Sequence, residues 1–522
     1  MSTNKNISIG IMIIIAAITI FSNLSGFPLL DPDEPVYAET PKEMILSNDF
    51  LSPKIYGEYW YDKPPMYYWL VAMSYQVFGI NDFAARFPSA FLSLLSIIAI
   101  YFYGKKLFNH KVGIYSALIL VTSIEFFYLG KAAVTDITLN FCLMVSLFAF
   151  LSRQYYTFYI FAGLAVLTKG PIGLFFPGVI VFLYLVCLKK FHLLSEMKIL
   201  SGSIIFCLVA LPWYIYMYSL HGSAFIDSFL GFHNITRFTS PEHPSGLLWY
   251  YYLPVLLVGF FPWITLLFQS IYKSFSDSYG KFDHLLFLNL WAVIILLFFS
   301  ISKTKLVSYI LPMFPALAML VGWYLDKLTG RNYFGSKRSW GWIGCLLFLS
   351  ATFVYGCTIG IKEMPQAEIG FISLASTIIL MCLVTIFFLL KRNIEIAFKS
   401  QVVGMMIFSA VLVNLLFPKI APDFTSQHVS NVFLEQYDGT SDVYISKFLR
   451  PGISFYSGIY GNELVFSPKS IPDLEKVFTN KKTYFILRDI DYDRLPQSTI
   501  NQLTIINQID NKLILVETRF IK

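Results

Sequence analysis

Three carboxylates follow the first long apolar run of the chain, in the stretch Leu30-Asp31-Pro32-Asp33-Glu34-Pro35. Asp31, Asp33 and Glu34 lie within four residues of one another and between prolines. Like charges this close repel, so one of the three carboxyls should titrate at a high pH, which suits a proton acceptor in catalysis. A solvated acidic turn explains the same spacing, and the spacing alone does not decide between the two interpretations.

The pair Asp62-Lys63 lies about thirty residues further on, within the aromatic stretch Tyr59–Trp69. Aromatic faces stack on sugars, and a lysine ammonium holds a phosphate as a point charge. A belt of Trp and Tyr at the membrane surface explains several of the aromatic residues without any ligand. That belt does not explain the acid–base pair, so Asp62 and Lys63 are candidates for binding a sugar phosphate.

Two further polar positions interrupt apolar sequence. Asp136 follows Thr135 where a helix is expected to begin, and helix N-capping explains either residue without a substrate. Lys169 interrupts an apolar stretch at Thr168-Lys169-Gly170-Pro171. A charge at membrane depth costs about 2.5–3.5 kcal/mol, so Lys169 needs a partner or a function. The alternative is a tight turn from which the lysine reaches toward the membrane surface.

The loop 220–246 contains Arg237 and three histidines, His221, His233 and His243. Together with a carboxylate such as Asp62, His233 and His243 are weak candidates for a divalent-metal site. Their spacing matches no established ligand pattern, and separate polar or capping roles explain them equally simply.

The segment Ser302–Pro312 places Lys303 and Lys305 on the predicted outer side of the membrane, close to Tyr309. Lysines on that side oppose the usual enrichment of positive charge in cytoplasmic loops, which mildly favours an anionic ligand. Lysines that extend from a helix end toward the membrane surface are the alternative.

The elements that carry these residues are predicted to be membrane helices. The chain has 522 residues, of which 56% are hydrophobic and only 14% charged. Soluble proteins carry about 25% charged residues, so an ordinary cytosolic enzyme and a disordered chain are both excluded. None of the six cysteines has metal-ligand spacing, and all lie in or beside apolar runs, where they serve packing.

About thirteen apolar runs are long enough to be membrane-helix candidates. With a cytoplasmic N-terminus, the inner loops hold sixteen Lys and Arg and the outer loops about ten. The first run is read as an uncleaved anchor. This threading predicts a membrane domain over 1–418, with its first outer loop at 31–86, and a soluble domain over 419–522 on the same outer face.

The sequence after residue 418 alternates apolar and polar residues in three short stretches, 442–446, 483–487 and 512–516. Such alternation predicts strands, and a helix is expected at 472–480. We therefore expect a small extracytoplasmic α/β domain. A structural lid is its simplest role.

The chain resembles the GT-C glycosyltransferases, and within them the group that contains protein O-mannosyltransferases and the bacterial aminoarabinose transferases that modify lipid A. The resemblance rests on Asp33-Glu34 after the first membrane helix, on Tyr37, and on the element Tyr61-Asp62-Lys63-Pro64. Further matches are Thr135-Asp136, Leu167-Thr168-Lys169-Gly170, Asn234-Ile235-Thr236-Arg237-Phe238, and Lys305 with Tyr309 and Leu311-Pro312.

The resemblance implies inverting transfer of a sugar from a polyprenyl-phosphate donor on the outer side of the bilayer, with no nucleotide or nucleic acid involved. The acceptor would be lipid A, another cell-envelope glycolipid, or a protein hydroxyl. Asp33 would be the general base, with Glu34 second, and Lys63 would stabilise the leaving phosphate. Additional phosphate contacts are implied for Arg237, Lys305 and Lys169. The remaining substrate-binding candidates are Tyr37, Asp62, Asp136 and Tyr309.

The chain departs from the aminoarabinose transferases at three positions. Val36 stands where they have Arg, Asp62 where they have Glu, and Asn234 corresponds to their metal-binding His. Aminoarabinose specificity and a bound zinc therefore do not follow, and a hexose or another aminosugar is as good a candidate. A transporter of lipid-linked sugars is the main alternative function, and an O-antigen ligase or polymerase is the second.

Overall fold

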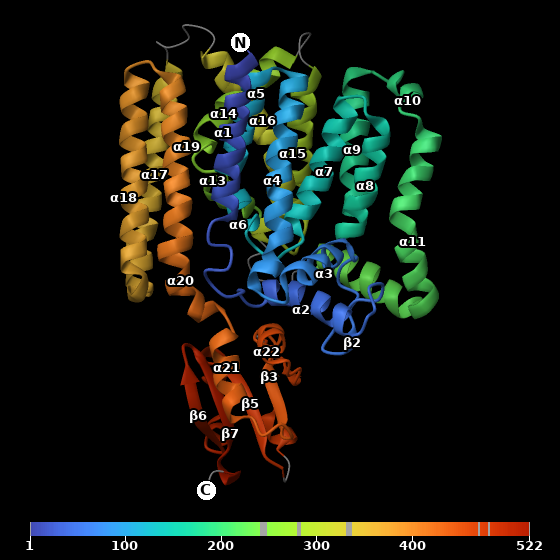
Figure 1. Ribbon diagram of the computed structural model, residues 1–522, viewed down its shortest axis with the longest axis vertical. Coiled ribbons are helices and arrows are strands. Elements are labelled where there is room, and N and C mark those ends of the chain that lie inside the picture. The colour runs from blue at the N-terminus through green and yellow to red at the C-terminus, as the bar shows by residue number, and fades with distance from the viewer. Residues whose placement is uncertain are drawn as a thin grey trace. The chain divides into compact units, whose positions relative to one another are not determined.

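The computed structural model describes residues 2–240, 248–278, 283–329, 337–467, 470–478 and 481–520 (Figure 1). The chain divides into two compact units. The first consists of Met1–Leu24, Tyr61–Leu70 and Arg86–Leu415, and the second of Ser25–Trp60, Val71–Ala85 and Leu416–Lys522. The sequence prediction assigned the whole first outer loop, 31–86, to the membrane domain. In the structure most of that loop packs within the second unit.

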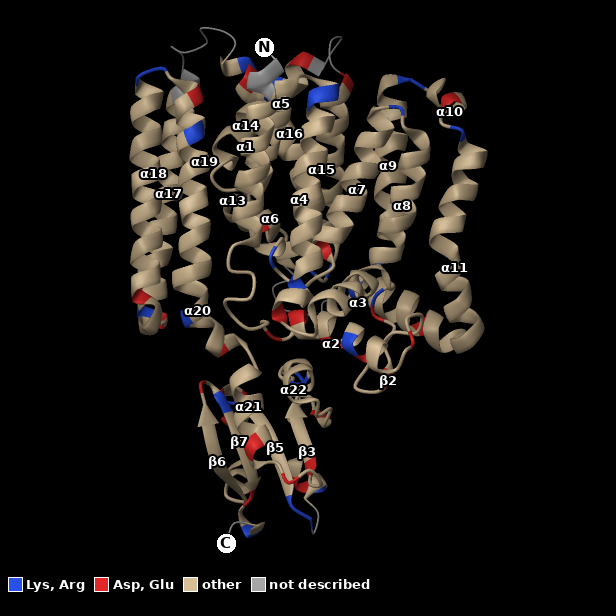
Figure 2. Ribbon diagram, viewed as in Figure 1, with Lys and Arg blue, Asp and Glu red and all other residues tan. Residues whose placement is uncertain are grey.

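The first unit is helical. Its elements are α1 (Ser2–Phe21), most of α4 (Asp82–Leu107), α5 (His110–Val121), α6 (Ile124–Leu129), α7 (Asp136–Leu151), α8 (Tyr155–Lys169), α9 (Ile172–Leu188), α10 (Leu193–Glu196), α11 (Ile199–Ile226), the π-helix η1 (Asp227–Thr236), α12 (Arg237–Thr239), α13 (Tyr252–Gly259), α14 (Ile264–Ser278), α15 (Asp283–Ile301), the 3-10 helix η3 (Val307–Met313), α16 (Phe314–Thr329), α17 (Lys337–Glu363), η4 (Pro365–Ala367), α18 (Glu368–Leu390), α19 (Ile394–Val411) and η5 (Leu412–Leu416). Charged residues gather near the ends of the long helices, whose middles are apolar (Figure 2).

Within the described residues, seven helices are long and apolar enough to cross a membrane. An eighth is counted if the pair Tyr252–Gly259 and Ile264–Asp277, bent by 107°, forms one broken span. Four shorter apolar helices accompany them, at Asn6–Phe21, His110–Val121, Asp136–Leu151 and Ile172–Leu188. The chain is therefore a polytopic membrane protein, and the number thirteen remains a prediction.

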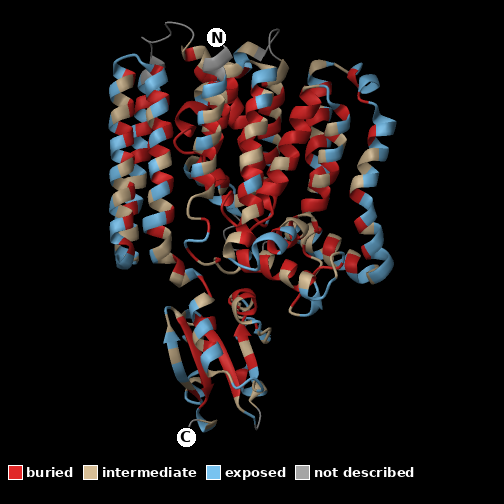
Figure 3. Cartoon of the chain, in the orientation of Figure 1, coloured by how far each residue is buried: buried red, intermediate tan, exposed pale blue. Residues whose placement is uncertain are grey.

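Burial differs sharply among the helices of the first unit (Figure 3). α7 and α16 are buried over almost their whole length, whereas α11 exposes most of its apolar side chains and α18 exposes one side of the helix and buries part of the other. Apolar side chains exposed along a helix are what a lipid environment accommodates. Buried α7 and α8 supply polar residues at their ends, because α7 begins at Asp136 and α8 ends at Lys169.

The second unit contains a five-stranded mixed sheet in the order β4-β3-β5-β7-β6. β3 pairs parallel with β4 and β5, whereas β7 pairs antiparallel with β5 and β6. The strands are β3 (Asp442–Ser446), β4 (Asn462–Leu464), β5 (Thr483–Arg488), β6 (Leu503–Ile509) and β7 (Lys512–Glu517). Both faces are covered: Val443, Ile445 and Ile486 pack on one side, and Phe485, Leu487 and Leu515 on the other.

Short helices and a hairpin make up the rest of the second unit. They are α2 (Asp33–Leu46), the hairpin β1 (Lys54–Ile55) and β2 (Glu58–Tyr59), part of α3 (Met66–Phe78), α20 (Phe417–Ile420), η6 (Ala421–Phe424), α21 (Gln427–Gln436), α22 (Arg450–Ser457), η7 (Leu474–Val477), α23 (Asp489–Tyr492), α24 (Gln497–Ile500) and η8 (Thr518–Phe520). The helix expected at 472–480 is wrong over its described part, which forms only the 3-10 turn η7. One such turn suffices to bury Leu474 in the core.

Candidate active site

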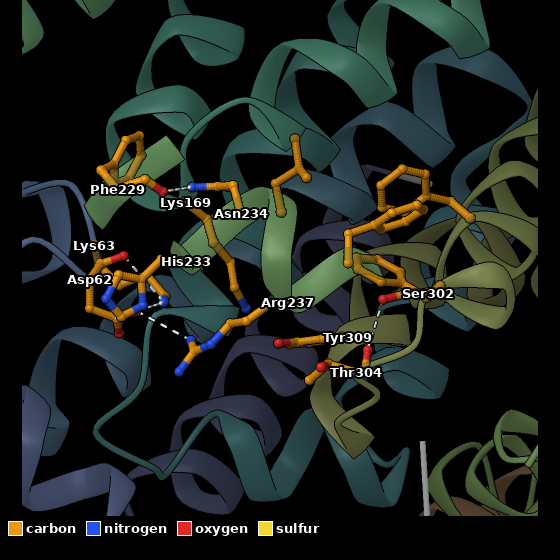
Figure 4. A pocket seen from close by; sticks show the side chains of 14 residues that line it. Asp62, Lys63, Lys169, Phe229, His233, Asn234, Arg237, Ser302, Thr304 and Tyr309 are labelled. Atoms are coloured by element: carbon orange, nitrogen blue, oxygen red, sulfur yellow. Dashed lines mark hydrogen bonds and ion pairs between the residues drawn. The ribbon is translucent and has the colours of Figure 1, made fainter. Parts of the chain in front are cut away.

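A pocket of about 640 Å³, including its open mouth, lies within the first unit (Figure 4). One wall is polar and the other is apolar. The lining residues are Asp62, Lys63, Lys169, Ile172, Phe229, His233, Asn234, Arg237, Phe238, Phe298, Phe299, Ser302, Thr304 and Tyr309.

Asp62 is the centre of the polar wall. Its Oδ1 lies 2.8 Å from Nζ of Lys63, 2.6 Å from Nδ1 of His233 and 3.2 Å from a terminal guanidinium nitrogen of Arg237. Burial by itself raises the pKa of Asp62, but Lys63, His233 and Arg237 outweigh it and hold that pKa well below the ordinary value. Asp62 is therefore an ionised acceptor that fixes three donors around one oxygen.

Lys63 and Arg237 bring two cationic side chains to this wall. Burial lowers the pKa of Lys63, Asp62 raises it and Arg237 lowers it further. Both side chains contact Asp62, and both line the pocket that an anionic ligand would enter. Arg237, with its side chain 27% exposed, is the more accessible of the two.

Backbone contacts fix the position of Arg237. The N–H of Thr304 donates to the carbonyl oxygen of Arg237 at 3.3 Å, and that of Lys303 donates to the carbonyl oxygen of Phe238 at 3.0 Å. The hydroxyl of Thr304 donates to the carbonyl oxygen of Ser240 at 3.0 Å. The segment before η3 therefore holds α12 in place.

A second ion pair lies beside the first. Nζ of Lys169 is 2.8 Å from Oδ1 of Asp136 and 4.9 Å from the ring centre of Tyr309. Gly170, with φ +74°, ends α8, and a Cβ there would lie 2.8 Å from the ring of Phe229. Only glycine fits this backbone conformation so close to the ring. The partner that the sequence required for Lys169 is Asp136.

The opposite wall is aromatic. Phe298 and Phe299 at the end of α15 lie at 5.1 Å between ring centres, and Phe299 lies 5.0 Å from Tyr309. Ile172 and Phe238 extend this surface. No sequence pattern distinguished these phenylalanines from the many lipid-facing ones, so their role in the pocket was not predicted.

His233 and Asn234 are neighbours in the π-helix η1 and have different contacts. Nδ1 of His233 lies 2.6 Å from Oδ1 of Asp62, whereas Asn234 donates from Nδ2 to the carbonyl oxygen of Phe229 at 2.6 Å. The correspondence of Asn234 to the metal-binding histidine of the aminoarabinose transferases stays a prediction.

The weak metal candidates do not form a metal site as placed. Asp62 and His233 contact each other directly at 2.6 Å, whereas two ligands of one zinc ion, each about 2.0–2.2 Å from it in tetrahedral geometry, lie further apart. Among the described residues, no group of three His, Cys, Asp or Glu side chains is arranged to bind a metal. His243 lies outside the described residues, and His221 packs against the ring of Tyr61 at 5.3 Å.

Six predicted residues line the pocket together: Asp62, Lys63, Lys169, His233, Arg237 and Tyr309. Asp136 reaches it through its ion pair with Lys169. Lys305 is buried next to Thr304 but is not a lining residue.

Asp33, Glu34 and Tyr37 belong to α2 in the second unit. Asp33 is exposed at the first position of the helix. Glu34 is buried, and its Oε2 accepts a hydrogen bond from the N–H of Leu30 at 2.9 Å. The carboxyl with the raised pKa is Asp31, at about 8; burial is the main cause and Glu34 adds a smaller repulsion. Repulsion between neighbouring carboxylates, which was expected to raise the pKa, is therefore only a minor cause of the shift.

Comparison with known proteins shows which families the chain is similar to. Residues 62–216 match the family described as dolichyl-phosphate-mannose-protein mannosyltransferase. An uncharacterised protein of Aquifex aeolicus is 31% identical over 362 residues, which are 67% of this chain and 70% of the relative.

Two further similarities concern aminoarabinose transferases. The undecaprenyl phosphate-alpha-4-amino-4-deoxy-L-arabinose arabinosyl transferase of Aeromonas salmonicida is 32% identical over 306 residues, 56% of this chain and 55% of the relative. The crystal structure of ArnT from Cupriavidus metallidurans bound to undecaprenyl phosphate matches with a TM-score of 0.78 and 21% identity, over 97% of both chains. The chain belongs to the group of GT-C glycosyltransferases that contains the protein O-mannosyltransferases and the lipid A aminoarabinose transferases.

Proposed function

We propose that the chain transfers a sugar from a polyprenyl-phosphate donor to an acceptor on the outer side of the cell membrane, with inversion at the anomeric carbon. The observation that carries the proposal is the pocket wall in which Lys63 and Arg237 share Asp62 opposite an aromatic surface. Such a site suits a ligand with an anionic phosphate joined to an apolar chain.

In this reaction Lys63 and Arg237 bind the donor phosphate. Negative charge grows on that phosphate as the bond between the anomeric carbon and the phosphate oxygen breaks. Fixed cations stabilise that charge without having to reorganise during the reaction. Lys169 and Tyr309 bound the same pocket, and the wall containing Phe298 and Phe299 suits the first prenyl unit. Asp136, Asp62 and Tyr37 are proposed to shape the site for the sugar and acceptor.

Asp33 is the proposed general base. An acceptor hydroxyl attacks the anomeric carbon and passes its proton to the Asp33 carboxylate, while polyprenyl phosphate leaves with the bonding electron pair. Asp33 is exposed, whereas Glu34 is buried and accepts from Leu30, so Asp33 is preferred of the two. An acceptor phosphate already carries its nucleophilic oxygen as an anion and needs no base.

Lipid A or another cell-envelope glycolipid is the favoured acceptor, because curated relatives are aminoarabinose transferases. Val36 and Asp62 differ from that group, so the sugar is proposed as a pentose or hexose without further assignment. The N-terminus is proposed to be cytoplasmic and residues 419–522 extracytoplasmic. The family match is to transferases and gives no support to the transporter alternative.

The test is a transfer assay in liposomes with a panel of polyprenyl-phosphate sugars and total lipid as acceptor. Wild type should release polyprenyl phosphate and form a labelled product. Lys63→Met should lower release by about 10²–10³-fold, the usual effect of removing a group that stabilises developing charge. Lys399→Met is the matched control, since Lys399 is exposed and pairs only along its own helix with Glu395, at 2.8 Å. Tight donor binding without turnover by wild type would contradict the proposal and favour transport.

A further inference from the structure

Helix α2, which begins with Asp33 and Glu34, lies against α22 within the second unit. α22 belongs to the C-terminal part of the chain, about 400 residues later. The residues just before α2 are held by the C-terminal part of the chain. The N–H of Leu29 donates to the hydroxyl of Tyr456 at 2.8 Å, and the N–H of Asp31 donates to the carbonyl oxygen of Phe424 at 2.8 Å.

Asp31 itself is held by side chains from the C-terminal part. The hydroxyl of Ser426 donates to Oδ2 of Asp31. Gly452 in α22 lies so close that a Cβ there would be 2.3 Å from Oδ1 of Asp31 and 2.8 Å from Cβ of Ser426. Real Cβ atoms do not approach other atoms this closely, so any side chain at position 452 must displace Asp31 or Ser426.

Lys42 lies in the C-terminal half of α2 and contacts α22. Its Nζ donates to the carbonyl oxygens of Ser454 at 3.1 Å and Phe455 at 3.0 Å, in the last turn of α22. The carbonyl of Ser454 also accepts from the N–H of Gly458 at 2.9 Å, so Lys42 adds a second donor there and places a positive charge at the negative end of the helix dipole. The same Nζ pairs with Oε2 of the buried Glu39 at 2.9 Å.

Glu43 and Arg450 fix the far end of α2. Glu43 accepts hydrogen bonds from the N–H groups of Tyr56 at 2.5 Å and Gly57 at 2.9 Å. The guanidinium of Arg450, the first residue of α22, lies 3.9 Å from the ring centre of Tyr56. The C-terminal part of the chain therefore contacts the approach to α2, at Leu29 and Asp31, and the C-terminal half of α2, at Lys42.

α2 cannot hold this position alone. It has 14 residues and contains Pro41, which has no N–H for the helical hydrogen bond. Isolated helices of about this length are marginal in water even without a proline.

We propose that the C-terminal domain is a positioning element for the catalytic carboxylate, with Lys42, Ser426 and Gly452 as positioning residues. This inference rests on the proposed function, in which Asp33 acts on the acceptor. It assigns the C-terminal domain a role in turnover, whereas the structural lid expected from the sequence would only cover the site.

The test compares Gly452→Ala, Lys42→Met and Lys42→Arg with Lys447→Met in the full-length protein. Lys447 is a fair control because it is 66% exposed, and its ion pair with Glu463 is loose, at 3.9 Å. The readouts are kcat, KM for the polyprenyl-phosphate sugar, and hydrogen exchange of the amides of α2 and β5.

Gly452→Ala and Lys42→Met should lower kcat by about tenfold to a hundredfold, since a displacement near 1 Å can have that effect. KM for the donor should stay within about twofold, because the phosphate contacts of the first unit are unchanged. Hydrogen exchange should rise in α2. It should stay unchanged in β5, and unchanged exchange there would show that the C-terminal domain remains folded. Lys42→Arg, which keeps the charge and the donors, should recover most of kcat.

Unchanged kcat in both variants, with wild-type transfer intact, would overturn the positioning role alone. An equal loss caused by Lys447→Met would also overturn it. Absence of transfer by wild type with every donor would instead overturn the proposed function, and the positioning role with it.

Discussion

Two carboxylates in different units, the buried Asp62 and the partly buried Asp31, show how differently the same side chain is used. Asp62 is surrounded by Lys63, His233 and Arg237, and its pKa is held far below the ordinary value. Asp31 has a hydroxyl partner, Ser426, and burial raises its pKa to about 8. The first arrangement organises cations for an anionic ligand, and the second secures the entry to a helix.

The difference follows from what surrounds each group rather than from the depth of burial. Desolvation is the largest influence on both pKa values and acts in the same direction. Three close cationic or donor groups reverse it at Asp62, whereas one hydroxyl and the more distant Lys512 do not reverse it at Asp31. We therefore expect loss of Asp62 to leave its cationic partners uncompensated, and loss of the Asp31 carboxyl to change how stability depends on pH.

The largest effect should come from Asp62→Asn. Removing one partner of a buried ion pair costs about 3–5 kcal/mol, because the remaining charge is left uncompensated. Denaturant unfolding in detergent should show this loss. The double variant Asp62→Asn/Lys63→Met should recover part of it, and a double variant that is less stable than Asp62→Asn would contradict the pairing.

Arg237→Met should weaken binding of undecaprenyl phosphate about tenfold, since a charge-assisted hydrogen bond contributes about 1.5–3 kcal/mol and this side chain is partly exposed. Binding is measured by displacement of a labelled polyprenyl phosphate, with Arg153→Met as the control on an exposed side chain. Equal affinities of wild type and Arg237→Met would remove Arg237 from the phosphate site.

Asp31→Asn should change how stability depends on pH. The unfolded carboxyl ionises near its ordinary value of 3.8, while the folded one keeps its proton up to about pH 8. The stabilising contribution is therefore complete below about pH 4 and is lost as the pH rises to about 8. Tm measured between pH 5 and 9 should fall more steeply for wild type than for Asp31→Asn. Parallel curves would show that Asp31 does not titrate in this range.

The smallest effect should come from Tyr309, whose ring faces Lys169. Tyr309→Phe keeps the ring and should leave the donor KM nearly unchanged. Tyr309→Leu removes a cation–π contact of about 0.5–1 kcal/mol and should raise the donor KM about two- to fivefold. A larger effect of Tyr309→Phe than of Tyr309→Leu would mean that the hydroxyl, and not the ring, is the important group.

Much of the pocket was predictable because charges in apolar sequence need partners. Lys169 required an acid, and Asp136 provides it. Asp62 and Lys63 were identified as an unusual pair among aromatics, and they line the pocket together. His233 and Asp62 were predicted to lie together only as weak metal candidates, and the structure places them in direct contact. The π-helix that carries His233 was not predicted, because it has no clear sequence signature.

The contacts around α2 were beyond sequence reasoning for a different reason. Ser426 and Gly452 lie about 400 residues from Asp31, and nothing in the spacing of small residues indicates which segment they approach. The strands expected near 442–446, 483–487 and 512–516 lie where alternation placed them. Alternation locates strands, but it does not show which helix packs against them.

The most direct measurement compares donor binding with transfer in Lys63→Met and Asp33→Asn, using the same labelled polyprenyl-phosphate sugar. Lys63→Met should lose both binding and transfer. Asp33→Asn should bind the donor as wild type does and, with a hydroxyl acceptor, release almost no polyprenyl phosphate. Two results would contradict the proposed division between a phosphate-binding unit and a helix that carries the catalytic carboxylate. One is transfer by Asp33→Asn to that acceptor at the wild-type rate. The other is a loss of donor binding in Asp33→Asn as large as that in Lys63→Met.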